Sequence, residues 1–208
     1  MCSVLASQTS AHNAQAQSVK CVKCVRPCAF RSDGPLTQSL GGSQYILVVL
    51  NDASRFSWIE CIEYKSDAAS SLIATIKLWE CETQSKVRVV RSDGGKEFCN
   101  HTMNSFFRSN GIQHQVTVRN TPEQNGRVER LNRDLMDKAR AMIFQCGAPL
   151  KLWAEAVATA NRVGNVILHL GKTKTPFELF YGQNLIYLDC EYLAAQHMCM
   201  CQKRNARS

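Results

Sequence analysis

The sequence has no apolar run long enough to span a membrane, which takes about 18 to 20 residues, and no N-terminal signal peptide. We therefore expect a soluble, intracellular protein whose 11 cysteines remain reduced. The 208 residues, of which 45% are hydrophobic, are sufficient for one domain with its own core.

A complete zinc motif is also missing. Cys21 and Cys24 have the spacing of half a zinc site, but only His12 lies upstream of them. Near the other end, Cys199 and Cys201 have no spacing that could complete such a site. The sequence therefore does not favour structural zinc.

Acidic residues are the minority among the charged ones, with 17 Asp and Glu against 25 Lys and Arg and a formal net charge of +8. Such a balance suits a protein that neutralises phosphate groups, although it does not identify the partner. The arginines at positions 119, 127, 130 and 133 cluster around Glu129. Because no base-reading element is evident, contacts with a nucleic acid should be mainly to its backbone.

Two acidic residues stand in contexts that a carboxylate metal site would require. Residues 87–95, VRVVRSDGG, predict a short strand that ends at Asp93, where a glycine turn begins. Glu129 follows a loop rich in helix-breaking residues and lies in the first turn of a helix predicted over residues 127–145. Each residue also has an ordinary interpretation, because aspartate is common in turns and glutamate complements a helix dipole. Alternatively, the carboxylates of Asp93, at the end of a strand, and Glu129, on the helix, lie close together over a sheet and form a metal site.

The hydrophobic pattern predicts an α/β sandwich with a mixed sheet. Glu129, Arg133 and Arg140 should line the edge of the apolar stripe on the 127–145 helix. We expect Trp79, Trp153 and the pair at 106 and 107 to be core residues. The predicted strands are 45–50, 56–64, 87–93 and 112–118, and the predicted helices are 66–85, 100–110 (ended by Gly111), 127–145 and 150–168. The apolar stripe comprises Val128, Leu131, Leu135, Ala139 and Met142.

From about residue 32 to residue 187, the chain resembles the integrase catalytic core of copia-type LTR retrotransposon Pol polyproteins. RSDGGKEF at 91–98 is similar to the family's second-aspartate motif, and TPEQNGRVERLNR at 121–133 is similar to its catalytic-glutamate motif. The gap of thirty-five residues between Asp93 and Glu129 is the family's own. Residues 45–58 resemble the hairpin after the first catalytic strand, and residues 152–157 and 174–179 resemble the trailing helices.

This resemblance implies a ribonuclease H-like fold, with a mixed five-stranded sheet flanked by helices. It also implies three carboxylates that hold two divalent cations, Mg²⁺ or Mn²⁺, because hard cations prefer oxygen ligands. The implied activity is that of a polynucleotidyl transferase and endonuclease that trims DNA 3′ ends and joins them to target DNA. Such a protein would bind both DNAs, act as a homo-oligomer, and work in the nucleus after a cytoplasmic particle stage.

By resemblance, Asp33 is the first of the three carboxylates. The segment 32–35, SDGP, lacks the two residues that the family places between this aspartate and Gly-Pro. The run before it is also a poor strand, because Pro27 cannot donate to a ladder. Asp52 is the fallback acid, but its neighbours match the hairpin, and we expect it to be a turn residue.

The DNA contacts are expected around Glu129. Arg133, one turn further on, is the predicted phosphate contact, and Asn125 and Gln124 are predicted polar contacts on a flexible loop. Arg127, Arg130 and Lys96 are the remaining candidates for DNA binding. For Arg130, a place on the solvated face of the helix is an equally good interpretation.

Three segments are expected: a degenerate or disordered zinc-module remnant at 1–30, the core at 31–187, and a divergent basic tail at 188–208. The shortened Asp33 segment leaves open a second function, a catalytically inactive, element-derived DNA-binding or interaction remnant. Ribonuclease H proper would share the carboxylate chemistry, but the PEQNG loop and the residues after it disfavour that alternative.

Overall fold

The computed structural model describes residues 22–25, 37–92, 95, 97–116 and 122–183, with side chains left undescribed at 22–25 and 122–125. Its strands are β1 (Val22–Val25), β2 (Tyr45–Asn51), β3 (Ser57–Ile62), β4 (Val89–Ser92) and β5 (Gln113–Val116). Its helices are α1 (Ala68–Thr83), α2 (His101–Ser109), α3 (Pro122–Gln145), α4 (Trp153–Val166) and α5 (Pro176–Tyr181). Short 3₁₀ turns, Lys65–Asp67 and Leu150–Leu152, precede α1 and α4. None of the described helices is both long and apolar enough to cross a membrane.

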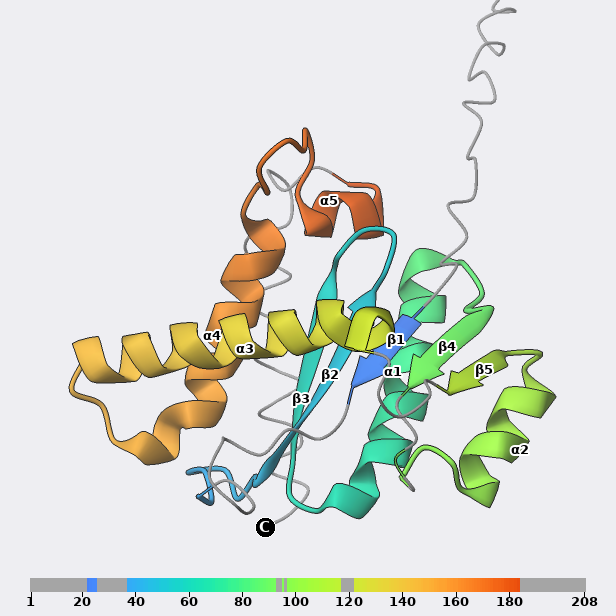
Figure 1. Cartoon of the computed structure of the whole chain (residues 1–208), viewed down its shortest axis with the longest axis horizontal. Coiled ribbons are helices and arrows are strands. Elements are labelled where there is room, and N and C mark those ends of the chain that lie inside the picture. Colours follow the sequence, from blue (N-terminus) through green and yellow to red (C-terminus); the bar gives the residue numbers. More distant parts are fainter. Residues whose placement is uncertain (1–21, 26–36, 93–94, 96, 117–121, 184–208) are drawn as a thin grey trace, which may run out of the picture.

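The described strands form one mixed sheet of five strands in the order β3-β2-β1-β4-β5 (Figure 1). β1, β2 and β3 pair antiparallel in turn, whereas β4 runs parallel to β1 and β5 parallel to β4. Both faces of β2 are buried, which explains its nearly continuous apolar sequence, YILVVLN. Leu47 and Val49 face the layer that contains α1 and α2, and Val48 and Leu50 face α3 and α4.

The centre of the sheet corrects one expectation from the sequence. β1 comes from residues 22–25, within the segment that was expected to precede the core, so the folded unit includes Val22. The strand ends at Val25, two positions before Pro27, and a proline within it would remove a ladder hydrogen bond. Its short sequence, VKCV, was too weak a local signal to predict a central strand.

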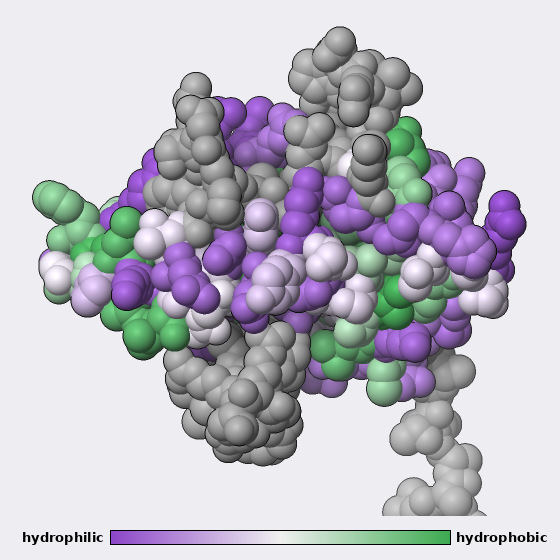
Figure 2. Space-filling model, turned by 90° about the horizontal axis from the view of Figure 1, so that it is seen from below, coloured by the Kyte–Doolittle hydropathy of each residue, from purple (hydrophilic) through white to green (hydrophobic). Residues whose placement is uncertain are grey.

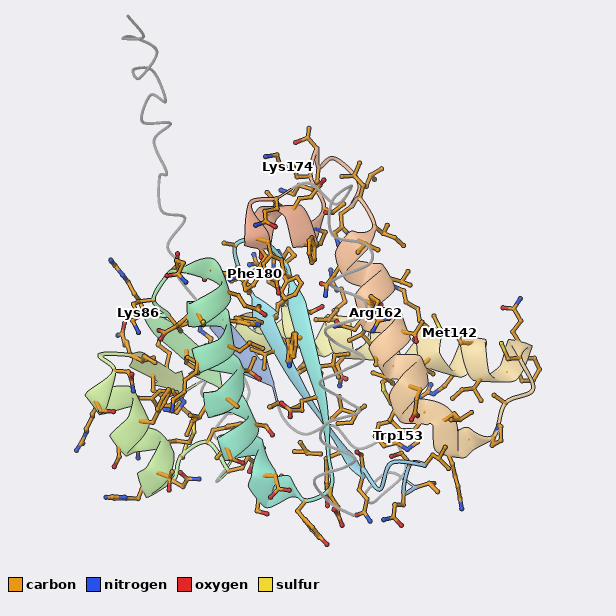
Figure 3. All side chains as sticks on the ribbon, turned by 180° about the vertical axis from the view of Figure 1, so that it is seen from behind. Lys86, Met142, Trp153, Arg162, Lys174 and Phe180 are labelled. Atoms are coloured by element: carbon orange, nitrogen blue, oxygen red, sulfur yellow. The ribbon has the colours of Figure 1, made fainter. Side chains whose placement is uncertain are left out.

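An aromatic cluster joins the end of the β2–β3 turn to α1 and α5. Phe56 stacks on Phe180 with ring centroids 4.4 Å apart and meets Trp79 edge-on at 6.0 Å. Phe177 and Tyr181 complete the cluster around the same ring. Figure 3 shows Phe180 beneath α5, on the side of the helix that faces the sheet. The cluster confirms that Trp79 is a core residue.

Polar contacts attach α4 to the edge of the sheet. The Asn165 amide accepts a hydrogen bond from the Ser57 backbone N–H (2.9 Å) and donates one to the Ser57 carbonyl (2.8 Å). Asn161 also donates to this carbonyl and accepts from the Ser57 hydroxyl. At the other end of α4, the Trp153 indole donates to the Thr37 carbonyl (2.8 Å). The bonds to Ser57 satisfy buried polar groups of the edge strand β3 and hold it against the helix.

The predicted short helix over 100–110 is confirmed as α2. The Asn100 side chain accepts from the Met103 backbone N–H (2.8 Å), which is a standard N-cap. The chain leaves the helix at Gly111, whose φ of 65° is the left-handed conformation that glycine tolerates. Phe107 is buried, as predicted, and Phe106 is partly buried.

Candidate active site

The helix that carries Glu129 begins earlier than its sequence suggested. α3 starts at Pro122 rather than at 127, so Glu129 lies about two turns inside the helix and not in its first turn. The backbone of Gln124 and Asn125 is helical, so the flexible loop expected there is wrong. Their side chains, and hence their predicted DNA contacts, lie outside the described residues.

A sequence signal for this early start was present. At α5, Thr175 caps the helix by accepting from the Glu178 N–H, and Glu178 accepts from the Thr175 N–H, with Pro176 between them. Residues 121–124, TPEQ, have the same pattern, with Thr followed by Pro and with Gln in place of Glu three positions after the Thr. Proline is favoured at the first helical position because the N–H that it lacks would have no partner there. Pro122 therefore starts a helix rather than interrupting one.

The buried side of α3 lies on the sheet face that contains Leu50. Val128 is fully buried in the same cluster as Leu50, and Leu135 and Ala139 continue the buried stripe, as predicted. Figure 1 shows α3 crossing this face. α3 contacts both β1 and β2, and Val128, next to Glu129, packs in the cluster that includes Leu50 of β2.

Strand register assigns the residues of β4 to the two faces. Lys23 on β1 pairs with Leu50 on one side and with Arg91 on the other, so Arg91 belongs to the face covered by α3. Val90, one residue earlier, is buried in the opposite layer, and Ser92 is also buried. This alternation is the usual period of two along a strand. Arg91 donates to the Gln115 side chain on β5 (2.8 and 3.2 Å).

Glu129 is exposed to solvent directly after the buried Val128. Among the described residues, its carboxylate has no hydrogen-bond or ion-pair partner. The side-chain oxygen of Asn132, three positions further on, is buried and likewise lacks a donor in the described part of the chain. Sequence reasoning missed Asn132, although its spacing from Glu129 makes the two neighbours on the helix surface. The Glu129 carboxylate is thus accessible from solvent, and the Asn132 oxygen is a buried acceptor without a donor among the described residues.

The arginines of α3 fall into two groups. Arg127 forms an ion pair with Asp52 (2.7 Å), and Arg140 forms one with Asp137 (3.2 Å). Arg130 and Arg133 are exposed and have no acidic partner among the described residues. The second group is therefore free to neutralise an external anion.

Asp52 lies in the turn between β2 and β3, which confirms its prediction as a turn residue. Two of the predicted metal ligands, Asp33 and Asp93, lie outside the described residues, as does Lys96. β1 contains no carboxylate, and Asp33 is eight positions beyond its last residue, Val25. Considering only the described positions, no three His, Cys, Asp or Glu side chains gather as a metal site.

Side-chain contacts fix the chain on both sides of Asp93. On one side, the Ser92 hydroxyl lies 2.8 Å from Nε2 of His114 on β5. On the other, Glu97 forms an ion pair with Lys65 (3.3 Å), and the carboxylate is nearly buried. Phe98, which follows, is fully buried in the core. These contacts restrict the backbone before and after the predicted ligand.

Burial lowers the pKa of His114 below its usual value of 6.5. The unfolded chain therefore takes up this proton at a higher pH than the folded chain does, and the free energy of unfolding should fall as the pH drops below about 6.5. Above that pH the imidazole is neutral in both states and contributes no pH dependence. Replacing His114 with glutamine should reduce the loss of stability between about pH 7.5 and pH 5, measured by urea unfolding. The exposed His101, replaced in the same way, is the control, and equal pH profiles for wild type and His114→Gln would contradict the assignment.

The far end of α3 has a different surface. Figure 2 shows hydrophobic residues at the end of the molecule where α3 connects to α4 in Figure 1. The exposed hydrophobic side chains of this segment are Phe144 (90% exposed) and Leu150 (55%). The two arginines of α3 without an acidic partner among the described residues, Arg130 and Arg133, lie in the other half of the helix, with Glu129.

Comparison with known proteins finds matches to integrase core domains. Residues 30–122 match the family model of the integrase core domain. The chain is 36% identical over 128 residues to the Pol polyprotein of transposon TNT 1-94 from Nicotiana tabacum, covering 61% of this chain and 10% of the polyprotein. The chain is therefore similar to the integrase core domains of retrotransposon Pol polyproteins. The matched integrase core segment includes Asp33 and Asp93 but ends before Glu129.

Further polyproteins of retrotransposons also match the chain. The chain is 26% identical over 149 residues to the Pol polyprotein of transposon RE2 from Arabidopsis thaliana, covering 70% of the chain and 10% of the relative. It is 28% identical over 123 residues to the transposon Ty1-DR4 Gag-Pol polyprotein of Saccharomyces cerevisiae, covering 58% and 8%. The chain therefore spans about a tenth of the length of these relatives.

A solved structure shows the same fold. The HTLV-2 integrase catalytic core domain, determined in complex with magnesium in a trimeric form, superposes with a TM-score of 0.58. The match covers 78% of this chain and 97% of that domain, at 16% sequence identity. The ribonuclease H-like α/β fold predicted from the sequence is therefore confirmed. At this level of sequence identity, the similarity supports the fold alone.

Proposed function

We propose that this integrase core domain processes DNA 3′ ends and transfers them to a target phosphodiester. The supporting observation is that Arg91 of β4 and the buried side of α3 share one face of the sheet. Val128 packs beside Leu50 on that face, and strand register assigns Arg91 to it. Asp93 directly follows Ser92, the last described residue of β4, and we propose that its carboxylate acts together with that of Glu129.

Asp93 and Glu129, with Asp33, would hold the two divalent cations, Mg²⁺ or Mn²⁺. The residues present fit this role, because Glu129 is exposed and unpaired among its described neighbours and the Asn132 oxygen lacks a donor. Hard cations bind such oxygen atoms. When bound, the metal ions would activate the nucleophile and stabilise the charge that develops at phosphorus. Glu129 itself would act as a ligand, and its place on a packed helix would limit its motion.

The unpaired arginines supply the DNA-binding part of the proposal. Arg133 lies one turn beyond Glu129, so a phosphate bound there would be close to the metal ligands. Arg130 is the second phosphate contact, with Lys96, Gln124 and Asn125 as further contacts near the same site. We propose that the chain works as a homo-oligomer on chromosomal DNA in the nucleus.

Replacing Arg133 with glutamine should weaken DNA binding and reduce its salt dependence. If Arg133 neutralises one phosphate, the slope of log affinity against log salt should decrease in magnitude by about 0.9. The measurement is fluorescence anisotropy of a labelled DNA duplex at several KCl concentrations. Arg140→Gln is the control, because Arg140 already pairs with Asp137 and should leave the slope unchanged. Equal slopes for the Arg133 variant and wild type would exclude the contact.

A second candidate function is a DNA-binding remnant without catalysis. The observation that favours it is β1, which contains no carboxylate although it occupies the centre of the sheet. A strand-transfer assay over a titration of Mg²⁺ and Mn²⁺ distinguishes the candidates. For an active enzyme, Asp33→Asn should lower the rate by about 100-fold or more, as Asp93→Asn should. DNA binding without product at any metal concentration would identify a remnant.

A further inference from the structure

The turn between β2 and β3 is connected to α3 through a shared carboxylate. The Arg127 guanidinium donates to Oδ1 of Asp52 at 2.7 Å, and Arg55 approaches the same oxygen at 3.4 Å. We infer that Arg127 is a positioning residue, which pairs with Asp52 to hold the segment of α3 that carries Glu129. This inference rests on the proposed function for the role of Glu129, but the anchoring itself can be tested separately.

Asp52 is a suitable anchor because its turn is well defined. The Asn51 side chain accepts hydrogen bonds from the N–H groups of Ala53 and Ser54, both at 3.0 Å. The Arg55 N–H closes the turn on the Asn51 carbonyl at 2.9 Å. Asn51 is itself buried. The carboxylate therefore occupies a preset position, and pairing with it costs little further backbone entropy.

The first described turns of α3 have few other contacts to hold them. Between Gly126 and Leu131, Val128 is fully buried and Leu131 packs partly buried against the same cluster, whereas Leu135, Met136 and Ala139 bury the next part of the helix. Contacts on one side of a helix limit its distance from the sheet more than its rotation about the helix axis. The ion pair with Asp52 supplies a second point of attachment.

The geometry of the helix connects this second point to Glu129. Arg127 and Glu129 flank Val128, and successive residues are about 100° apart around an α-helix. Holding Arg127 on one side of Val128 therefore determines the direction in which Glu129 points on the other. Loss of the ion pair would allow this part of α3 to rotate or fray and would displace the Glu129 carboxylate.

The same pairing argues against a DNA contact for Arg127. To bind a phosphate, Arg127 would have to leave Asp52, and the negative charge of the nearby Asp52 carboxylate would oppose the approach of a phosphate. Arg130 and Arg133 have no such competitor among the described side chains. Phosphate binding is therefore assigned to these two residues and anchoring to Arg127.

The test compares wild type with Asp52→Asn, Arg127→Gln and the exchanged pair Asp52→Arg with Arg127→Asp. Amide hydrogen exchange over residues 122–131 should become about two- to fivefold faster in the single variants, as expected for loss of a partly exposed ion pair. The exchanged pair should restore slow exchange. Arg140→Gln breaks a pair within α3 and is the matched control, with no expected change over 122–131.

Strand-transfer kinetics provide the second measurement. The single variants should lower kcat about two- to fivefold without changing KM for DNA, and the exchanged pair should recover the rate. Unchanged hydrogen exchange in both single variants would overturn the inference. A smaller salt slope for DNA binding in Arg127→Gln would also overturn it, because that result would identify a phosphate contact. If exchange responds as expected but no chain transfers DNA strands, the anchoring stands and the proposed function fails.

Discussion

Replacing Glu129 with glutamine is expected to abolish strand transfer that depends on Mg²⁺ or Mn²⁺. Glutamine has nearly the same shape but lacks the negative charge that a carboxylate ligand offers to a hard cation. A loss of about 100-fold or more in rate is expected, because the reaction depends on correctly held metal ions. The rate should be measured with labelled DNA ends and a target duplex.

Two properties should survive this substitution. Glu129 is exposed and unpaired among the described residues, so the midpoint of thermal unfolding should stay the same within the usual range for surface changes. DNA affinity should persist, because the phosphate contacts are assigned to Arg130 and Arg133. Asp134→Asn, on the exposed side of the same helix, is the matched control for removing one negative charge. Full activity in Glu129→Gln would reject the assignment of the site.

Replacing Phe56 with alanine is expected to be the most destabilising of the changes considered. Phe56 is fully buried and contacts the rings of Trp79, Phe177, Phe180 and Tyr181. Removing the ring should lower the free energy of unfolding by about 3 to 5 kcal/mol, from lost burial and the cavity left behind. Urea unfolding followed by circular dichroism would measure this change.

The control for this prediction is Phe144→Ala, at a position where the ring is 90% exposed. Its effect on stability should stay within about 0.5 kcal/mol. A cost below about 1 kcal/mol for Phe56→Ala would mean that the cluster does not hold the β2–β3 turn to α1 and α5. Because Phe56 follows the turn that contains Asp52, its loss should also speed amide exchange in that turn.

Elements with strong local patterns were predicted well from the sequence. The hairpin expected at 45–50 and 56–64 appears as β2 and β3, and the helix expected at 66–85 appears as α1. The helical spacing of apolar residues predicted α1, and a short apolar run bounded by turn residues predicted β2. Gly111 ends α2 as expected, because few other residues adopt its left-handed conformation readily.

Elements that depend on distant partners were predicted poorly. β1 has only four residues, and it forms a central strand because β2 and β4 pair with it on both sides. The sequence of residues 22–25 alone does not predict that these strands pair with it. The start of α3 was wrong for a different reason, since Pro122 was treated as a helix breaker although proline favours the first helical position.

Residue types and spacing were sufficient to predict the fold class, the two acidic motifs and the cationic segment around Glu129. These properties depend on the identity and order of residues that are near one another in the sequence. They could not distinguish Arg127, which pairs with Asp52, from Arg133, which has no acidic partner among the described residues. That distinction depends on a contact between residues 75 positions apart. Charge is a property of the residue, but whether the charge is free to bind DNA depends on what the folded chain places beside it.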